Sequence, residues 1–111
     1  MTDLTLSNGA LELAASVYGR PDGQPILFLH GLGGSRDSWE EGARRLMDLY
    51  QIWTLDFRGH GHSKRAETYD LEGYRSDAKV ALEAIARPTL VAGHSLVAGA
   101  VGRPKCTFGF P

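Results

Sequence analysis

Cysteine is nearly absent from this 111-residue sequence, which contains only Cys106. A single cysteine excludes a disulfide within the chain and a zinc site built from cysteines, and it fits a reducing compartment. The sequence also lacks an apolar run near the roughly 20 residues of a membrane-spanning helix. Its first residues have neither the basic nor the apolar region of a signal peptide. We therefore expect a cytoplasmic protein that does not contact a membrane.

An excess of charge of one sign is also missing. The formal net charge is −1, from 12 basic and 13 acidic residues that are interspersed along the chain. Nucleic acids and anionic membranes are bound through basic patches, so neither is expected as a partner. Apolar residues make up 42% of the sequence, which is typical of a globular domain. The spacing of the histidines offers no metal-binding pair on a helix, and we expect no metal and no cofactor.

The first third of the chain reads as three strands. Residues 4–6 and 11–13 alternate between apolar and polar side chains on either side of Asn8-Gly9, a hairpin turn signal. The second strand is expected to continue toward Val17-Tyr18. Residues 25–30 (PILFLH) are continuously apolar up to the histidine, as in a strand that is buried on both faces of a parallel sheet.

Two helices are predicted to alternate with further strands. Ser38 and Glu41 have the spacing of a capping box, which starts a helix. Asp70 can cap a second helix, and Arg87-Pro88 ends it. Strands are expected at residues 51–55 and 89–92. The apolar stripes at helical spacing are typical of core packing, and they comprise Trp39, Ala43, Leu46, Met47 and Tyr50 in the first helix and Leu71, Tyr74, Ala78, Leu82 and Ile85 in the second.

This order, β-β-β-α-β-α-β, indicates an α/β fold with a mainly parallel sheet and an antiparallel edge. Three glycine-rich segments, residues 31–34, 59–61 and 93–95, follow the last three predicted strands. Ligands of such sheets bind beyond the carboxyl ends of the strands. The functional site is therefore expected where these three segments meet.

Three motifs carry a resemblance to a known family. They are HGLGGS at residues 30–35, DFRGHGHS at residues 56–63 and GHSL at residues 93–96. In this order and spacing, residues 4–96 resemble the N-terminal part of the α/β-hydrolase superfamily, in its group of esterases, lactonases and C–C hydrolases. GHSL matches four of the five positions of the G-x-S-x-G nucleophile elbow, in which a serine lies on a sharp turn between strand and helix.

The resemblance implies a role for individual residues. Ser95 matches the catalytic nucleophile, and the backbone N–H groups of Leu32 and Leu96 match the oxyanion hole. His30 and His94 are implied to be supporting residues, with His30 bracing its loop. The implied activity is serine acyl transfer on a small-molecule substrate, an ester or a related carbonyl compound. Within residues 56–63, the matching Asp and Arg shape the loop in the family.

The sequence departs from the family directly after the nucleophile. Val97 stands where the elbow has glycine, and residues 96–111 contain no Asp, Glu or His. The family's acid and base lie downstream of the serine, so we expect this chain to be inactive by itself. We interpret residues 1–96 as a partial α/β-hydrolase domain whose C-terminal half is missing, and residues 97–111 as a divergent tail.

Two origins of this tail are open: a frameshift or premature stop that truncated the family sequence, or a short protein with its own C-terminus. In either case the strand at residues 89–92 is expected to have an open edge, through which the chain could self-associate. The alternative to an enzyme is a non-catalytic fragment or a binding remnant that uses the glycine-rich pocket without chemistry.

Other site types fit less well. Residues 31–36 resemble a dinucleotide-binding G-x-G-x-x-G, but Arg36 occupies the third glycine position and would crowd the helix. No Gly-Lys-Ser/Thr follows, which argues against a P-loop. His60 and His62 are interpreted as loop residues held by hydrogen bonds.

Overall fold

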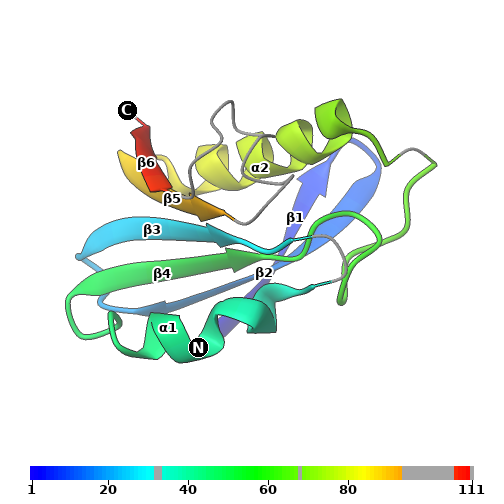
Figure 1. The fold of residues 1–111 in the computed structure, drawn as a ribbon. Helices are drawn as coiled ribbons and strands as arrows, with labels where there is room; N and C mark the ends of the chain where they lie inside the picture. Colours follow the sequence, from blue (N-terminus) through cyan, green and yellow to red (C-terminus); the bar gives the residue numbers. More distant parts are fainter. Residues whose placement is uncertain (32–33, 68, 94–106, 111) are drawn as a thin grey trace.

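A computed structural model describes residues 1–31, 34–67, 69–93 and 107–110. These residues form one mixed sheet with helices on both of its faces (Figure 1). Within this part of the chain, none of the helices combines the length and apolar character that a bilayer crossing requires. The elements are β1 (Thr2–Asn8), β2 (Leu11–Gly19), β3 (Gln24–Leu29), the 3-10 helix η1 (Arg36–Trp39), α1 (Glu40–Arg44), β4 (Tyr50–Leu55), α2 (Leu71–Ile85), β5 (Thr89–Gly93) and β6 (Thr107–Phe110).

The strands are ordered β1-β2-β4-β3-β5-β6 across the sheet. β4, β3 and β5 run parallel to one another, whereas β1 and β2 form an antiparallel hairpin whose second strand pairs with β4. Figure 1 shows the three parallel strands pointing toward the same end of the molecule. This confirms the predicted α/β fold, with a parallel centre and an antiparallel edge.

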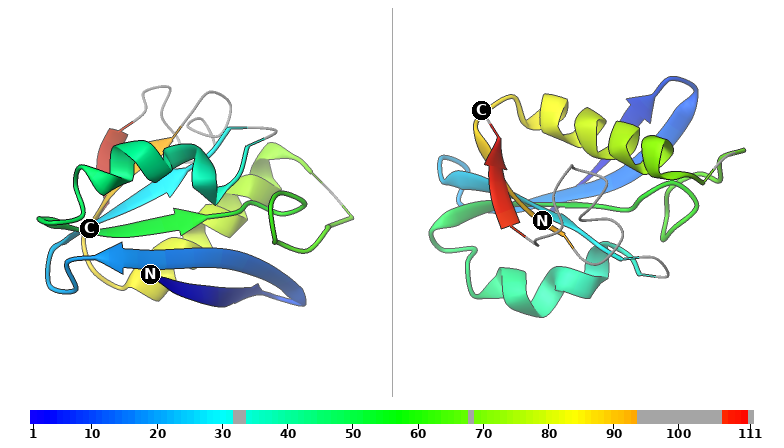
Figure 2. Two further views of the ribbon diagram at one scale, coloured as in Figure 1. Left: turned by 90° about the horizontal axis from the view of Figure 1, so that it is seen from below. Right: turned by 45° about the horizontal axis from the view of Figure 1, so that its top comes forward.

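The central strand β3 is buried on both faces, as its continuous apolar sequence predicts. Leu27 and Leu29 face α2, and Ile26 and Phe28 face the side of η1 and α1. Because side chains alternate along a strand, this division follows directly from the pleat. Figure 2 shows the sheet between α2 on one side and α1 on the other.

The larger of the two core layers lies beneath α2. Tyr74, Ala78, Ala81 and Ile85 of the helix pack on apolar side chains of β2, β3, β4 and β5. Asp70 caps the helix as predicted, because its Oδ1 accepts a hydrogen bond of 2.8 Å from the N–H of Gly73. The apolar stripe differs from the prediction at its start, where Leu71 is 48% exposed. Leu71 is the first residue of the helix, and at that end its side chain is only partly covered.

The first predicted helix begins earlier and is shorter than expected. Ser35, not Ser38, is its N-cap, and Ser38 occupies the N3 position that we assigned to Glu41. The capping box therefore consists of two serines. The helical segment starts as η1 and continues as α1 only to Arg44, while Tyr50 begins β4. Gly42 in the middle of α1 weakens a longer helix, yet Trp39, Ala43, Leu46 and Met47 still pack on the sheet as the stripe predicts.

The edge of β5 is not open, contrary to our expectation. β6 pairs with β5 in antiparallel orientation, with Thr89 opposite Phe110 and Ala92 opposite Thr107. The sequence T-F-G-F alternates polar or small residues with aromatic ones, a pattern that a short strand tolerates. The N–H and C=O groups of β5 thus have partners, and the reason given for self-association through this edge is lost. Self-association itself stays a prediction.

Candidate functional site

The carboxyl ends of the parallel strands bring the predicted site segments to one edge. Leu29, the last residue of β3, lies opposite Gly93 of β5 and opposite Leu55 of β4. The last residues of the three parallel strands, Leu29, Leu55 and Gly93, therefore lie side by side at this edge. Four predicted site residues, Leu32, His94, Ser95 and Leu96, lie outside the described residues. The fifth, His30, is described.

His30 is almost completely buried directly after β3, with 1% of its surface exposed. Its Nε2 accepts a hydrogen bond of 3.0 Å from the N–H of Phe57, so its Nδ1 carries the proton and donates to the Gly31 carbonyl at 2.7 Å. Both ring nitrogens are therefore occupied by backbone groups. Burial lowers the pKa of His30, and the neighbouring His60 lowers it further. The neutral imidazole joins the loop after β3 to the loop after β4.

Asp56 is the hub of the loop that follows β4. Its carboxylate is 1% exposed and accepts from the backbone N–H of Arg36 at 2.6 Å and from the N–H of His62 at 3.0 Å. The guanidinium of Arg36 adds an ion pair of 2.9 Å through Nε. A buried carboxylate with a charged partner and several donors is well satisfied. It fixes the start of η1 against the loop of residues 56–63.

Gly59, Gly61 and Ser63 fix the backbone of this loop around Asp56. Gly61 has a φ of +50°, and a Cβ at this position would overlap the carboxylate of Asp56. Gly59 has a φ of +73°, and its open side is covered by the ring of Tyr69. The Ser63 hydroxyl donates to the Asp56 carbonyl and accepts a hydrogen bond of 2.8 Å from Ala14 of β2. The positive φ angles favour glycine at residues 59 and 61, and the Ser63 hydroxyl joins the loop to β2.

Arg58 points away from this hub and ties the loop to α2. Its Nε and Nη2 donate to the two carboxylate oxygens of Asp77 at 3.0 and 2.9 Å, and its backbone N–H donates to Oδ2 at 3.1 Å. Asp77 is fully buried, and it also accepts from the Asn8 side chain at 2.9 Å. The ion pair raises the pKa of Arg58. This bidentate bridge holds together α2, the loop after β4 and the first hairpin.

His60 and His62 are held by hydrogen bonds, as predicted. His60 donates from Nδ1 to the carbonyl of Arg58 at 3.0 Å, and its ring centroid lies 4.9 Å from that of His30. His62 accepts through Nδ1 from Arg36 at 3.1 Å. Among the described residues, no group of three or more His, Cys, Asp and Glu side chains is arranged to hold a metal ion.

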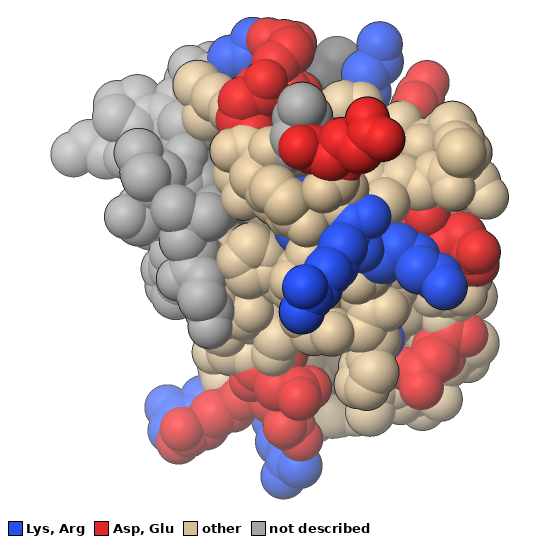
Figure 3. Space-filling view, turned by 90° about the vertical axis from the view of Figure 1, so that its right-hand side faces the viewer, with Lys and Arg blue, Asp and Glu red and all other residues tan. Residues whose placement is uncertain are grey.

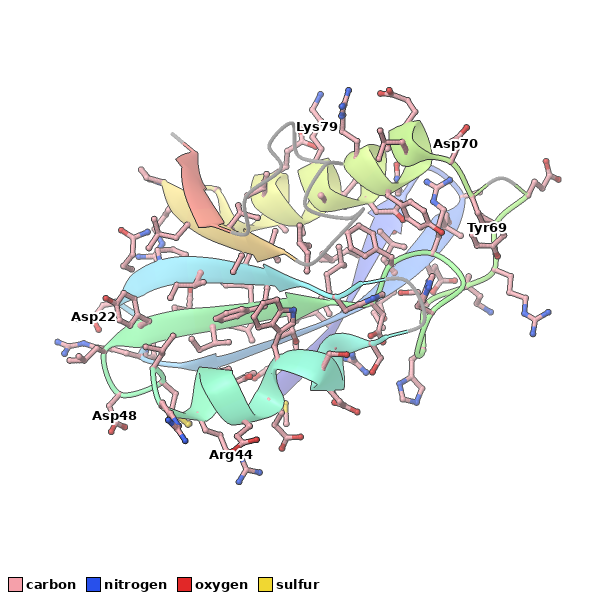
Figure 4. The ribbon with its side chains drawn as sticks, viewed as in Figure 1. Asp22, Arg44, Asp48, Tyr69, Asp70 and Lys79 are labelled. Carbon is pink, nitrogen blue, oxygen red and sulfur yellow. The ribbon has the colours of Figure 1, made fainter. Side chains whose placement is uncertain are left out.

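The surface at the carboxyl edge carries charges of both signs. Figure 3 shows basic side chains across the middle of this face, with acidic ones above and beside them. Figure 4 places Tyr69 and Asp70 at this end of the molecule and Asp22 and Asp48 at the opposite end.

Sequence reasoning missed three residues that organise this region: Asn8, Arg36 and Asp77. Asp77 could have been found, because it lies at helical spacing between the buried Tyr74 and Ala81. A carboxylate on the buried face of a helix requires a cationic partner. Arg36 was considered only as an obstacle to dinucleotide binding, and nothing local in the sequence indicates its contact with Asp56.

His30 should make the stability of the fold depend on pH. Its folded pKa lies below its unfolded value of about 6.5, so the unfolded chain binds the proton more readily. Stability from this group is therefore present above pH 6.5 and is lost as the pH falls below it. We expect His30→Gln, whose amide can donate and accept, to reduce the slope of unfolding free energy against pH just below pH 6.5 by up to about 1.4 kcal/mol per pH unit. Urea titrations followed by circular dichroism measure both slopes, and an unchanged slope contradicts the assignment.

Gly61 and Gly42 form a matched pair for testing the enclosure of Asp56. Gly61→Ala places a Cβ onto the carboxylate at a positive φ, so it should cost about 2 kcal/mol or more of unfolding free energy. Gly42→Ala meets open space in α1 and should be neutral or stabilise by up to about 1 kcal/mol. Urea denaturation measures both variants. Equal effects of the two substitutions would show that the loop does not need glycine at residue 61.

Comparison with known proteins agrees with this architecture. The chain is 34% identical over 106 residues to a non-heme chloroperoxidase of Burkholderia pyrrocinia, an alignment that covers 91% of this chain and 37% of that protein. Among solved structures, a putative aryl esterase from Burkholderia cenocepacia matches 90% of this chain and 39% of its own, at 31% identity and a TM-score of 0.81. A thioesterase domain from the curacin biosynthetic pathway matches 91% of this chain and 40% of its own, at 25% identity and a TM-score of 0.84.

The chain thus spans about two-fifths of the length of these relatives. A family model described as the alpha/beta hydrolase fold matches residues 24–96, which run from β3 through GHSL after β5. The match covers well over half of the sequence. The chain therefore belongs to the α/β-hydrolase fold family.

Proposed function

We propose that this chain carries the nucleophile half of a serine hydrolase site, with Ser95 as the nucleophile. The observation that supports this most is the pairing of Gly93 with Leu29. It starts the G-x-S-x segment at the carboxyl edge, next to the segment that begins with His30. A serine directly after a buried parallel strand is the arrangement of a nucleophile elbow.

The proposed chemistry is acyl transfer on a small ester or related carbonyl compound. The Oγ of Ser95 attacks the carbonyl carbon while a base takes the hydroxyl proton, which gives a tetrahedral intermediate. The intermediate collapses to the acyl-serine, and the leaving alkoxide takes the proton from the base and departs as an alcohol. The backbone N–H groups of Leu32 and Leu96 are proposed to donate to the oxyanion. Water then hydrolyses the acyl-serine. The family membership supports this class of reaction and leaves the substrate open.

His30 is proposed to support the oxyanion loop and not to act as the base. A general base needs a free nitrogen within hydrogen-bond reach of the nucleophile. Both nitrogens of His30 are taken by Phe57 and Gly31 at 3.0 and 2.7 Å. Its hydrogen bonds instead set the position of the Gly31 carbonyl, at the start of the loop that contains Leu32. His94, next to the nucleophile, is proposed as a second supporting residue.

The base and its acid are not among the residues that follow Ser95. Residues 96–111 contain no Asp, Glu or His. In the proposed mechanism these two groups must be contributed by polypeptide outside the 111 residues. The same observation favours a second candidate, in which the chain is a non-catalytic fragment or a binding remnant of the same fold.

The chain alone is expected to be inactive. A serine hydroxyl without a base is a poor nucleophile, so hydrolysis of p-nitrophenyl acetate should be negligible and equal in the wild-type chain and in Ser95→Ala. The release of p-nitrophenol, followed by absorbance at a saturating substrate concentration, measures both. Turnover that disappears in Ser95→Ala would show that a base lies within these residues.

The nucleophile role can be tested apart from the missing base. Residues 1–96 would replace the matching part of the Burkholderia cenocepacia putative aryl esterase, so that its own chain completes the domain. We expect the chimera to hydrolyse p-nitrophenyl acetate and the Ser95→Ala chimera to lose at least about 10³-fold in kcat.

Circular dichroism and the melting temperature provide the control, because both chimeras must fold equally well for the comparison to count. His30→Gln in the same chimera should lower kcat less than Ser95→Ala. A folded chimera without turnover, when the parent esterase is active, would contradict Ser95 as a working nucleophile and favour the non-catalytic candidate.

A further inference from the structure

Asn8 is the only asparagine in the sequence, and Gly9 follows it at the turn of the first hairpin. The turn is tight, because Asn8 at the end of β1 pairs with Leu11 at the start of β2. Gly9 has a φ of +63°, the positive value that a two-residue hairpin turn requires at its first position. The proposed acyl-transfer mechanism uses neither Asn8 nor Gly9.

The side-chain amide of Asn8 is fixed against α2. Its Nδ2 donates to the hydroxyl of Ser76 and to Oδ1 of Asp77, both at 2.9 Å. A carboxylate only accepts hydrogen bonds, so the amide must turn its NH2 group and not its oxygen toward Asp77. Both hydrogens of the amide nitrogen are therefore engaged by the helix, and Figure 1 shows the hairpin lying beside α2.

The backbone that follows Asn8 is open. Gly9 is exposed, and a Cβ built on it would meet no other atom within 4 Å. Because glycine has no side chain, its peptide nitrogen is the least shielded one that can follow an asparagine. Asn8 thus combines a restrained amide with an unhindered neighbouring nitrogen, and only the restraint keeps the two groups from reacting.

We propose that Asn8 is a site of spontaneous deamidation that the hydrogen bonds to α2 restrain in the folded chain. The peptide nitrogen of Gly9 gives its proton to hydroxide and attacks Cγ of Asn8. The side-chain nitrogen takes a proton from water and leaves as ammonia, and a five-membered succinimide remains. Water then opens one of the two C–N bonds of this ring, which gives aspartate or isoaspartate at residue 8.

The product does not fit the site that the amide occupied. An aspartate at residue 8 would place a second carboxylate against Asp77, which is fully buried and already paired with Arg58 at 2.9 Å. Like charges at this distance repel each other, and a donor to Asp77 is lost. Isoaspartate lengthens the main chain and shifts the register of the hairpin. Deamidation therefore releases the first hairpin from α2, irrespective of any role of Ser95.

The rate of deamidation tests the restraint. The full chain is incubated at mildly alkaline pH, folded or unfolded in guanidinium chloride, and intact mass and ion-exchange chromatography follow the exchange of NH2 for a hydroxyl group. Peptide mapping locates the product. We expect the folded chain to react at least about tenfold more slowly than the unfolded chain, because the hairpin must first open.

Ser76→Ala removes one of the two restraining contacts without touching the ion pair of Asp77. It should speed up the reaction of the folded chain about fivefold and leave the unfolded rate unchanged. Ser7→Ala, at an exposed position of the same strand as Asn8, is the matched control and should change neither rate. Equal rates in the folded and unfolded wild type, or a wild-type rate in folded Ser76→Ala, would overturn the proposal. So would an unfolded chain that keeps its asparagine.

The consequence of the reaction is tested with Asn8→Asp and Asn8→Ala. Both variants lose the donors to Ser76 and Asp77, but only Asn8→Asp adds a charge. We expect the melting temperature of Asn8→Asp, followed by circular dichroism at neutral pH, to lie several degrees below that of Asn8→Ala. Failure of Asn8→Asp alone to fold would agree with this expectation. Equal melting temperatures would show that the new carboxylate does not disturb Asp77, and would overturn the proposed release of the hairpin.

Discussion

The buried carboxylate of Asp56 is the interaction on which the carboxyl edge of the sheet depends. It stands at the end of β4 and receives donors from two segments, the start of η1 at Arg36 and the loop at His62. Removing a buried charge's partners is far more costly than the pair is worth in stability. This asymmetry makes the position of both segments obligatory, and it explains why glycine is needed at residue 61, where any Cβ would displace the carboxylate.

A second buried ion pair fixes the same loop from another side. Arg58 and Asp77 join the same loop to α2, and Asn8 extends the contact to the first hairpin. His30 links the loop after β3 to the backbone at Phe57. The DFRGHGHS segment thus has a structural role, because its charged side chains, Asp56 and Arg58, form ion pairs within the protein. Its effect on chemistry is indirect: it holds the edge where the segments after β3 and β5 emerge.

The strands and the order of the elements were predictable, because burial on both faces leaves a continuous apolar run such as residues 25–30. The helix boundary was less predictable. Ser35 and Ser38 both fit an N-cap, and the contact of the N–H of Arg36 with Asp56, 20 residues away, favours the earlier one. The pairing of β6 with β5 was missed because four residues near the end of the chain carry little pattern. Leu32, His94, Ser95 and Leu96 lie outside the described residues, so their predicted roles rest on the family resemblance.

The three parallel strands hold the edge at which the proposed nucleophile segment begins. β3 is paired on both sides within this chain, by β4 and β5, and the outer edge of β5 is paired by β6. One core layer is filled by residues 36–47, which include η1 and α1, and the other by α2. The register that starts GHSL beside His30 therefore depends on contacts that these residues make among themselves. In the proposed mechanism a base and an acid add proton transfer to this edge, and they need not create the edge itself.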